Sequence, residues 1–117
     1  MVDDCIFCKI IAGDIPSSKV YEDEEVIAFL DISQVTPGHT LVVPKKHARN
    51  LLEMDEMATA QLFTRVSKVA KKVATATQAK GMNIISNMEE VSGQTVFHTH
   101  VHIIPRYSDQ DELAISF

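Results

Sequence analysis

The sequence predicts an α+β domain, in which a mostly antiparallel five-stranded sheet is covered on one face by one long helix, with a short helix near the N-terminus. Three observations support this fold class. Five short segments have the composition of strands, one apolar repeat at helical spacing extends over residues 55–80, and the length of 117 residues suits one compact domain. We therefore expect a single domain over residues 1–117, with 108–117 as a short acidic tail.

The N-terminal part predicts a short helix followed by a hairpin. The segment Cys5–Ala12 is apolar and is closed by Gly13, which is typical of one or two helical turns. Two strand-like segments follow, Lys19–Glu22 and Val26–Leu30. Three acidic residues separate them, and this short polar connection favours a hairpin.

The middle of the chain predicts a third strand and then the long helix. The strand is expected at His39–Val43, after a Thr-Pro-Gly turn, and should stop at Pro44. The helix is expected at Asp55–Lys80, with Asp55 as its N-cap and Gly81 as its C-terminal stop. Its buried stripe is expected to consist of Met57, Leu62, Phe63, Val66, Val69, Ala70 and Val73.

The last two strands are expected at Met82–Ser86 and Thr99–Ile104, and Pro105 should end the final one. The net charge of −5 argues against a nucleic-acid partner, because binding to a phosphate backbone requires a positive surface. We see neither a secretory signal nor an apolar segment of membrane-spanning length. The sequence therefore predicts a cytoplasmic protein without a membrane partner.

The main chemical signal is the alternation of His98, His100 and His102. Side chains alternate between the two faces of a strand, so these imidazoles are expected to share one face while the core residues between them take the other. Three readings follow from the spacing: exposed histidines on a free sheet face, a metal site, or a neutral histidine nucleophile flanked by groups that orient it. Spacing alone does not separate the last two.

The segment His98–Ile104 resembles the signature of the histidine-triad (HIT) nucleotide-binding superfamily, in which histidines alternate with apolar residues. The resemblance covers nearly the whole chain before Arg106, and Thr99 departs from it only by being polar at an apolar position. Within the superfamily, the chain is most similar to the nucleoside phosphoramidases and their bacterial relatives. The further matching segments are Ile6–Ile11, Ala28–Ile32, Pro37–His47 and Gly93–Phe97.

The resemblance implies that His100 attacks the α-phosphorus of a purine nucleoside phosphoramidate, or of a related nucleoside monophosphate conjugate, and forms a covalent nucleotidyl-histidine that water then cleaves. It also implies that His39, His102 and Gln94 take part in catalysis. The implied nucleotide contacts are Asp31 on the ribose, Phe7, Ile10, Phe29 and Ile32 around the purine, and Asn87, Gln94, Thr95, His100 and His102 near the phosphate and leaving group.

Cys5 and Cys8 form a second signal, because a two-residue spacer lets both sulfurs reach one Zn²⁺ ion at ~2.3 Å. A reversible disulfide, a redox pair and two buried cysteines are the alternatives from the residues alone. The resemblance implies a structural zinc completed by His47 and His98, with no organic cofactor. His98 would then tie the nucleophile segment to the N-terminal helix.

The resemblance further implies a HIT fold that forms a homodimer, with a continuous ten-stranded sheet and packed long helices. Two other functions remain open. One is cleavage of dinucleoside polyphosphates, which uses the same nucleophile with a different leaving group. The other is a zinc-stabilised nucleotide-binding or scaffold protein with little turnover. The short tail gives no basis for carrying over a substrate preference.

Overall fold

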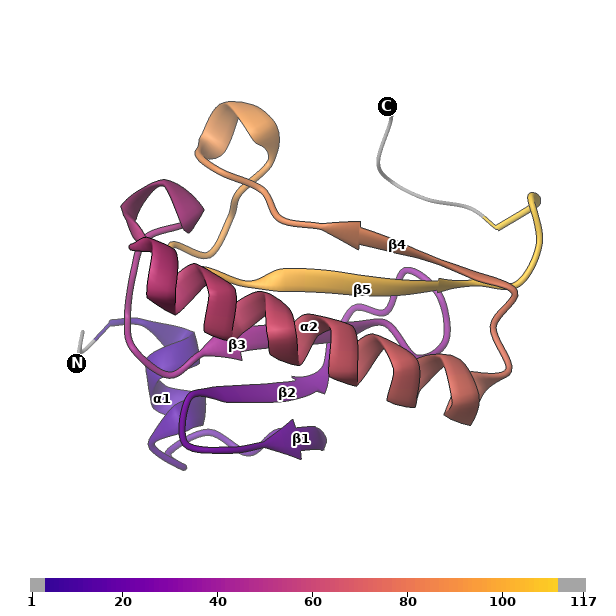
Figure 1. The fold of residues 1–117 in the computed structure, drawn as a ribbon, viewed down its shortest axis with the longest axis horizontal. Coiled ribbons are helices and arrows are strands. Elements are labelled where there is room, and N and C mark those ends of the chain that lie inside the picture. Colours follow the sequence, from indigo (N-terminus) through magenta and orange to yellow (C-terminus); the bar gives the residue numbers. More distant parts are fainter. Residues whose placement is uncertain (1–3, 112–117) are drawn as a thin grey trace.

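The computed structural model describes residues 4–111, which fold into a single five-stranded sheet with helices on both faces (Figure 1). This confirms the predicted α+β class and the predicted order of elements. No helix in the described part of the chain is long and apolar enough to cross a membrane. The elements are α1 (Ile6–Ile11), β1 (Lys19–Glu22), β2 (Val26–Leu30), β3 (Thr40–Pro44), α2 (Glu56–Thr77), β4 (Gly81–Ile85) and β5 (Val101–Arg106), with short 3₁₀ turns at Leu51–Glu53 and Glu90–Ser92.

The strand order is β1-β2-β3-β5-β4, and every neighbouring pair is antiparallel. Strand β5 lies between β3 and β4, so the histidine-bearing end of the chain enters the middle of the sheet. The two edges differ. Strand β1 has a register shift between Lys19 and Tyr21 where it pairs with β2, whereas β4 pairs with β5 in regular register from Gly81 to Ile85.

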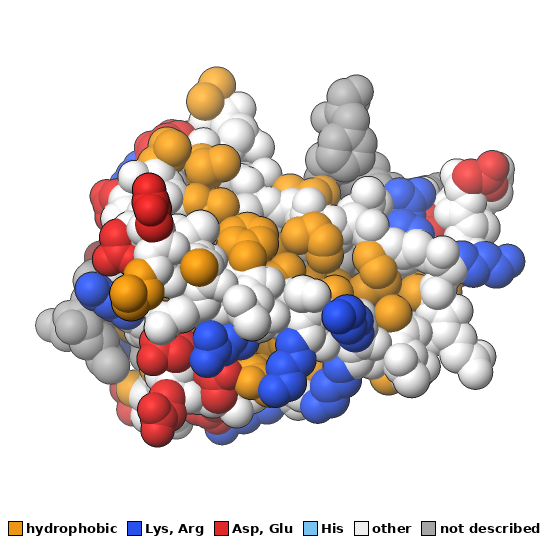
Figure 2. All heavy atoms as spheres, in the orientation of Figure 1, with side chains coloured by type: hydrophobic (Ala, Val, Ile, Leu, Met, Phe, Trp, Pro, Cys, Tyr) orange, Lys and Arg blue, Asp and Glu red, His pale blue; other side chains and the backbone are white. Residues whose placement is uncertain are grey.

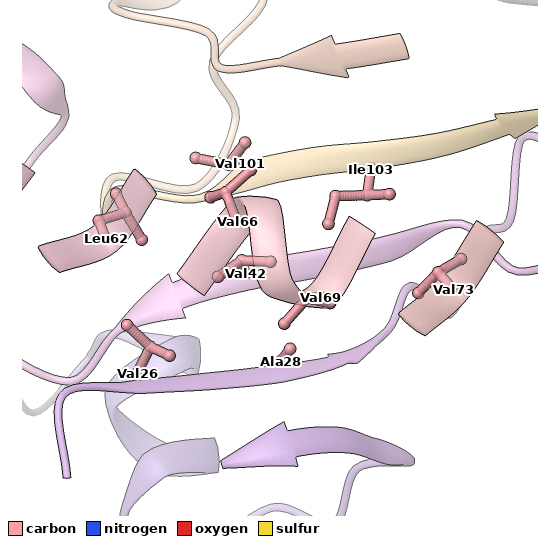
Figure 3. Close-up of a cluster of buried hydrophobic side chains, with 9 residues drawn as sticks. All are labelled: Val26, Ala28, Val42, Leu62, Val66, Val69, Val73, Val101 and Ile103. Carbon is pink, nitrogen blue, oxygen red and sulfur yellow. The ribbon is translucent and has the colours of Figure 1, made fainter. Parts of the chain in front are cut away.

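One face of the sheet packs against α2 (Figure 3). The helix contributes a narrow stripe of four buried residues, spaced three or four apart, as a helix lying on a sheet requires. The sheet contributes alternate residues from β2, β3 and β5. The cluster consists of Leu62, Val66, Val69 and Val73 against Val26, Ala28, Val42, Val101 and Ile103.

The opposite face of β2 and β3 is covered by α1, so the expectation of a helix on one face only was incomplete. The intervening residues of the two strands point to this side and pack against the short helix. Burial on both faces explains why these strands are continuous apolar runs rather than alternating ones. The second cluster consists of Phe7, Cys8 and Ile10 against Ile27, Phe29, Leu41 and Val43, with Cys5 beside them.

The long helix is shorter and its buried stripe narrower than expected. It ends at Thr77, and Gln78 adopts the left-handed conformation (φ 57°) that closes it, so the expected stop at Gly81 was wrong. Met57 and Phe63 are 74% and 37% exposed and lie outside the buried stripe. Figure 2 shows hydrophobic side chains gathered across this face, over α2 and the strands beside it.

Strand boundaries also differ for three strands. Strand β4 runs from Gly81 to Ile85, one residue earlier than the expected Met82–Ser86. Strand β3 runs one residue beyond expectation, to Pro44, and begins at Thr40 rather than at His39. Strand β5 begins at Val101 and includes Pro105. A proline is tolerated there because the pairing of β5 with β3 stops at Ile103, so beyond that point no partner on this side needs a backbone N–H.

Candidate functional site

The described structure brings all five histidines into two adjoining groups beside the start of β5. His98 and His100 precede the strand and are buried, while His102 lies on it and is half-buried. This burial rules out the reading of three exposed surface histidines. The rings of His100 and His102 lie 5.0 Å apart between centroids, and His39 approaches His102 at 5.2 Å.

The backbone fixes the orientation of His100. Its Nδ1 lies 2.7 Å from the carbonyl oxygen of His98. Because a carbonyl oxygen only accepts, Nδ1 carries the proton and Nε2 keeps its lone pair. Burial lowers the pKa of His100, and the edge of the Phe7 ring, at 5.1 Å between centroids, contributes to that burial. The ring is therefore neutral at pH 7 and presents a nucleophilic Nε2.

His39 and His102 form a directed pair. The backbone N–H of Val35 donates to His39 Nδ1 at 3.3 Å, which places the His39 proton on Nε2. This Nε2–H in turn donates to His102 Nδ1 at 2.9 Å. The proton of neutral His102 is consequently on Nε2, where it can donate to a ligand. Burial lowers the pKa of His102 to about 4, which favours this neutral form.

The turn that presents His39 requires a glycine. Gly38 has φ 91°, and a Cβ at this position would lie 2.7 Å from Thr77 Cγ2 at the end of α2. Thr36, at the start of the turn, donates to the carbonyl oxygen of Pro105 at 2.6 Å. The turn is thus fixed between the end of α2 and β5, and His39 is held beside His102.

The expected nucleotide contacts around the purine occupy two environments. Phe7, Ile10 and Phe29 are buried in the layer between α1 and the sheet, whereas Ile32 is 97% exposed. Asp31 lies at the end of β2. One of its carboxylate oxygens accepts from Ser33 N at 2.9 Å, and the other lies 3.6 Å from His39 Nε2.

Gln94 is placed as a structural residue of the loop between β4 and His98. Its side chain donates to the carbonyl oxygens of Arg49 (2.6 Å) and Val96 (3.0 Å), and accepts from Glu89 N (2.8 Å) and Asn50 Nδ2 (3.1 Å). These four hydrogen bonds use the whole hydrogen-bonding capacity of the amide. Its catalytic role therefore stays a prediction. On the same loop, Thr95 is exposed and Asn87 is half-buried.

The cysteine pair and the two remaining histidines form a compact cluster. The donor atoms of Cys5, Cys8, His47 and His98 all lie within 4.8 Å of one another. His98 Nδ1 lies 3.3 Å from Cys5 Sγ and 3.1 Å from His47 Nδ1, and Cys8 Sγ lies 3.4 Å from His47 Nδ1. Such separations fit four ligands bonded to one ion at ~2.0–2.3 Å.

The chemistry of this donor set also fits zinc. His98 Nε2 lies 2.8 Å from the carbonyl oxygen of Pro44, so Nε2 carries the proton and the Nδ1 lone pair points at the two sulfurs. Burial lowers the pKa of His98 to about 4 and raises the pKa of the Cys5 thiol. A cation at the centre of the cluster would stabilise the two thiolates and use both imidazole lone pairs.

Sequence reasoning missed Arg49, Asn50 and Glu89. Arg49 donates through Nε (2.7 Å) and Nη2 (2.9 Å) to the carboxylate of Glu89 and lies over the ring of Phe97 at 4.2 Å. Asn50 is almost fully buried and donates to the same carboxylate at 2.7 Å. The partners lie about forty positions apart in the chain, and no local pattern links such residues.

The model of the HIT domain family matches residues 12–109 of this chain. "Protein hit" of Bacillus subtilis is 56% identical over 109 residues, which are 93% of this chain and 75% of that protein. Adenosine 5'-monophosphoramidase hnt1 of Schizosaccharomyces pombe is 37% identical over 113 residues (97% and 82%). Adenylylsulfatase HINT3 of Arabidopsis thaliana is 38% identical over 104 residues (89% and 53%).

Solved structures are also similar to this chain over most of its length. SMU.412c from Streptococcus mutans superposes with a TM-score of 0.95 at 62% identity, and the match covers 100% of this chain and 74% of that one. A Zn-bound histidine triad family protein from Mycobacterium smegmatis superposes with a TM-score of 0.88 at 37% identity, covering 93% and 80%.

Proposed function

This chain belongs to the HIT domain family and is a hydrolase of that family, and we propose that it cleaves nucleoside phosphoramidates, or related nucleoside monophosphate conjugates, at the α-phosphate. The observation that carries the proposal is the state of His100, a buried neutral imidazole whose Nδ1–H is bonded to a backbone carbonyl and whose Nε2 is free to attack. The names of the plant and yeast relatives support a nucleotide substrate.

In the proposed reaction, His100 Nε2 forms a bond to the α-phosphorus while the phosphorus–nitrogen bond to the leaving amine breaks, and the amine takes up a proton from solvent water. Attack makes the imidazole cationic, and the hydrogen bond from Nδ1 to the His98 carbonyl stabilises that charge. The Nε2–H of His102 would donate to a phosphoryl oxygen as negative charge develops there. Water then cleaves the phosphorus–imidazole bond and releases the nucleoside monophosphate.

We place the nucleotide over the α1 layer and the end of β2. Phe7 contacts both Phe29 and the nucleophile His100, so the apolar layer adjoins the reacting nitrogen. The carboxylate of Asp31 lies next to His39 and can accept from ribose hydroxyls. The exposed Ile32 would cover the purine from outside. Asn87 and Thr95, on the loop before His98, are proposed to face the phosphate and leaving group.

We propose that zinc is bound by Cys5, Cys8, His47 and His98 and that its role is structural. Four protein donors complete a tetrahedral site and leave no position for a reacting water. The Zn-bound relative supports the identity of the ion. When bound, the ion joins α1 to the segment that carries His100, and it takes no part in the proposed chemistry.

We further propose a cytoplasmic homodimer joined through β4 and α2. Strand β4 is a regular sheet edge with Ile84 exposed, and Met57 and Phe63 are exposed on α2. Free thiols of the kind formed by Cys5 and Cys8 persist in reducing compartments. Sedimentation of a monomer at micromolar concentration would remove the dimer from this proposal.

The experiment that tests the function is hydrolysis of adenosine 5′-phosphoramidate, followed by release of AMP and by mass analysis of protein quenched in alkali, because the phosphorus–nitrogen bond of a nucleotidyl-histidine is labile in acid. We expect turnover by the wild-type protein and an AMP adduct on the peptide that contains His100. The His100→Asn variant removes Nε2 but retains an amide N–H for the His98 carbonyl, and it should show neither signal. A folded wild-type protein that binds AMP without cleaving the phosphoramidate, but cleaves diadenosine polyphosphates, would move the assignment to polyphosphate cleavage.

A further inference from the structure

One residue of the loop between β4 and His98 has a backbone conformation that glycine adopts far more easily than other residues. Glu89 has φ 76° and ψ 161°, outside the regions that a side chain with a Cβ normally occupies. Such a conformation persists only where the surrounding contacts impose it, and it often accompanies function. The side chain of Glu89 should therefore provide something that glycine could not.

The carboxylate of Glu89 is held by two residues from the segment that follows the zinc ligand His47. Arg49 donates two parallel hydrogen bonds to it, and Asn50 donates a third. The guanidinium of Arg49 is itself held over the ring of Phe97, immediately before His98. We call Arg49, Asn50 and Glu89 the loop clamp.

Stability alone does not account for the loop clamp. The side chains of Arg49 and Glu89 are 42% and 43% exposed, and ion pairs this exposed usually contribute little to the free energy of unfolding. The strained backbone of Glu89 acts in the opposite direction. The hydrogen bonds from Arg49 lower the pKa of Glu89, so the carboxylate stays charged around neutral pH and the clamp stays formed there.

The two ends of the loop adjoin the nucleophile. Ser86 Oγ donates to the carbonyl oxygen of His100 at 2.9 Å, and the far end leads directly into His98. Between these ends, the N–H of Glu89 donates to Gln94 Oε1, and its carbonyl oxygen accepts from Ser92 N at 3.1 Å. Fixing Glu89 therefore fixes the shape of residues 87–95 beside His100.

We propose that Glu89 is a positioning residue, whose carboxylate, held by Arg49 and Asn50, sets residues 87–95 in the conformation that meets the leaving group. This inference rests on the proposed function, because it assigns the loop to the leaving-group side of that reaction. Glu89 acts through the loop and touches no substrate.

Glu89→Gly is the decisive variant, because it removes the carboxylate and relieves the backbone strain together. If Glu89 were merely structural, its replacement by glycine would lower the Tm and reduce the turnover of both substrates to the same extent. We expect the Tm to be unchanged or raised and kcat/KM for adenosine 5′-phosphoramidate to fall about tenfold or more. The p-nitrophenyl ester of AMP has a leaving group that needs no proton, so its kcat/KM should fall less than about threefold.

Two control variants isolate the clamp. Glu89→Gln keeps an acceptor for Arg49 and should retain kcat/KM within about threefold of wild type. Glu90→Gly adds a glycine to the same loop at an exposed neighbour and should leave both substrates unaffected. A loss in Glu90→Gly equal to that in Glu89→Gly would mean that loop flexibility, and not the clamp, is responsible.

Unchanged turnover of the phosphoramidate by Glu89→Gly would overturn the inference, and so would equal losses for both substrates with a lowered Tm. A wild-type protein that cleaves neither substrate would instead refute the proposed function. In that case amide hydrogen exchange decides the inference. Glu89→Gly should accelerate exchange in residues 87–95 and leave α2 unchanged, and identical exchange in the loop would overturn it.

Discussion

His98 and His100 are separated by one residue and lie beside each other, yet the backbone binds opposite nitrogens of their rings. His98 donates from Nε2 to the carbonyl of Pro44 and presents Nδ1 to the two cysteines. His100 donates from Nδ1 to the carbonyl of His98 and presents Nε2 outward. Each carbonyl therefore determines which nitrogen is free, and the free nitrogen determines the role of the ring.

The two rings also differ in the side chains that surround them. Around His98, three further donor atoms converge and close a four-ligand site. Beside His100, His39 donates to His102, and this leaves the Nε2–H of His102 as the last group of the pair. No hydrogen-bond partner for this N–H is found among the described residues. We propose that the closed set holds a zinc ion and that the open set binds and releases a phosphate. Substitutions in one histidine group can therefore test whether the other group keeps its function without it.

The largest effect is expected from His100→Ala. Loss of the proposed nucleophile should lower kcat for adenosine 5′-phosphoramidate by about 10³-fold or more, because the proposed covalent step can no longer take place. The metal content, measured by elemental analysis, should stay at the wild-type level, because His100 supplies no ligand. Loss of metal together with activity would show that the two histidine groups are not separable.

The next effect is expected from Cys8→Ser, which removes a buried donor of the proposed zinc site. We expect loss of the metal and a destabilisation of more than about 3 kcal/mol, equivalent to a Tm lower by about 10 °C. Turnover should also fall, because His98 carries the carbonyl that orients His100.

A chelator provides the matched control for this variant. It should lower the Tm of the wild-type protein to that of Cys8→Ser and leave the Tm of the variant unchanged. A wild-type protein without metal, whose Tm does not respond to chelator, would refute the zinc site.

A smaller effect is expected at His39, which sets the tautomer of His102. His39→Leu removes the donor to His102 Nδ1 and should lower kcat by about 10²-fold. His39→Gln retains an amide N–H that can donate to the same atom, and it should lose less. Equal losses in the two variants would argue that the ring of His39, rather than its hydrogen bond, is required.

The smallest effect concerns pH and stability. Burial lowers the pKa of His102 from the ordinary value of 6.5 to about 4. Between these values the unfolded chain binds a proton that the folded chain does not, so the free energy of unfolding falls as the pH drops through this window. In zinc-saturated buffer, the Tm should fall by about 5 °C from pH 7 to pH 5, and by less in His102→Gln. Parallel curves would contradict this assignment.

Much of the fold was predictable because its signals are local. Alternation placed His98, His100 and His102 together, and the apolar spacing located α2. The boundaries were less predictable, because Gln78 rather than Gly81 ends the helix and Pro105 lies within β5. Both errors came from treating Gly and Pro as stop signals where the tertiary surroundings decide.

The contacts that link distant segments could not be predicted from the residues alone. Nothing in the sequence indicates that Arg49 pairs with Glu89. The same holds for Gln94, whose side-chain amide donates to two backbone carbonyl oxygens. Likewise, Phe63 satisfies the helical repeat but lies outside the contact with the sheet. Periodicity gives the face of an element, whereas the width of its contact depends on the neighbours that fold against it.

The unequal edges of the sheet have a consequence for how copies of this chain can associate. The register shift in β1 disturbs the row of backbone groups that an incoming strand would need, while β4 offers a regular row. Addition of strands is therefore favoured on one side only. A pairing of β4 with β4 uses up that side on both copies, so growth stops at two chains and does not proceed to a filament.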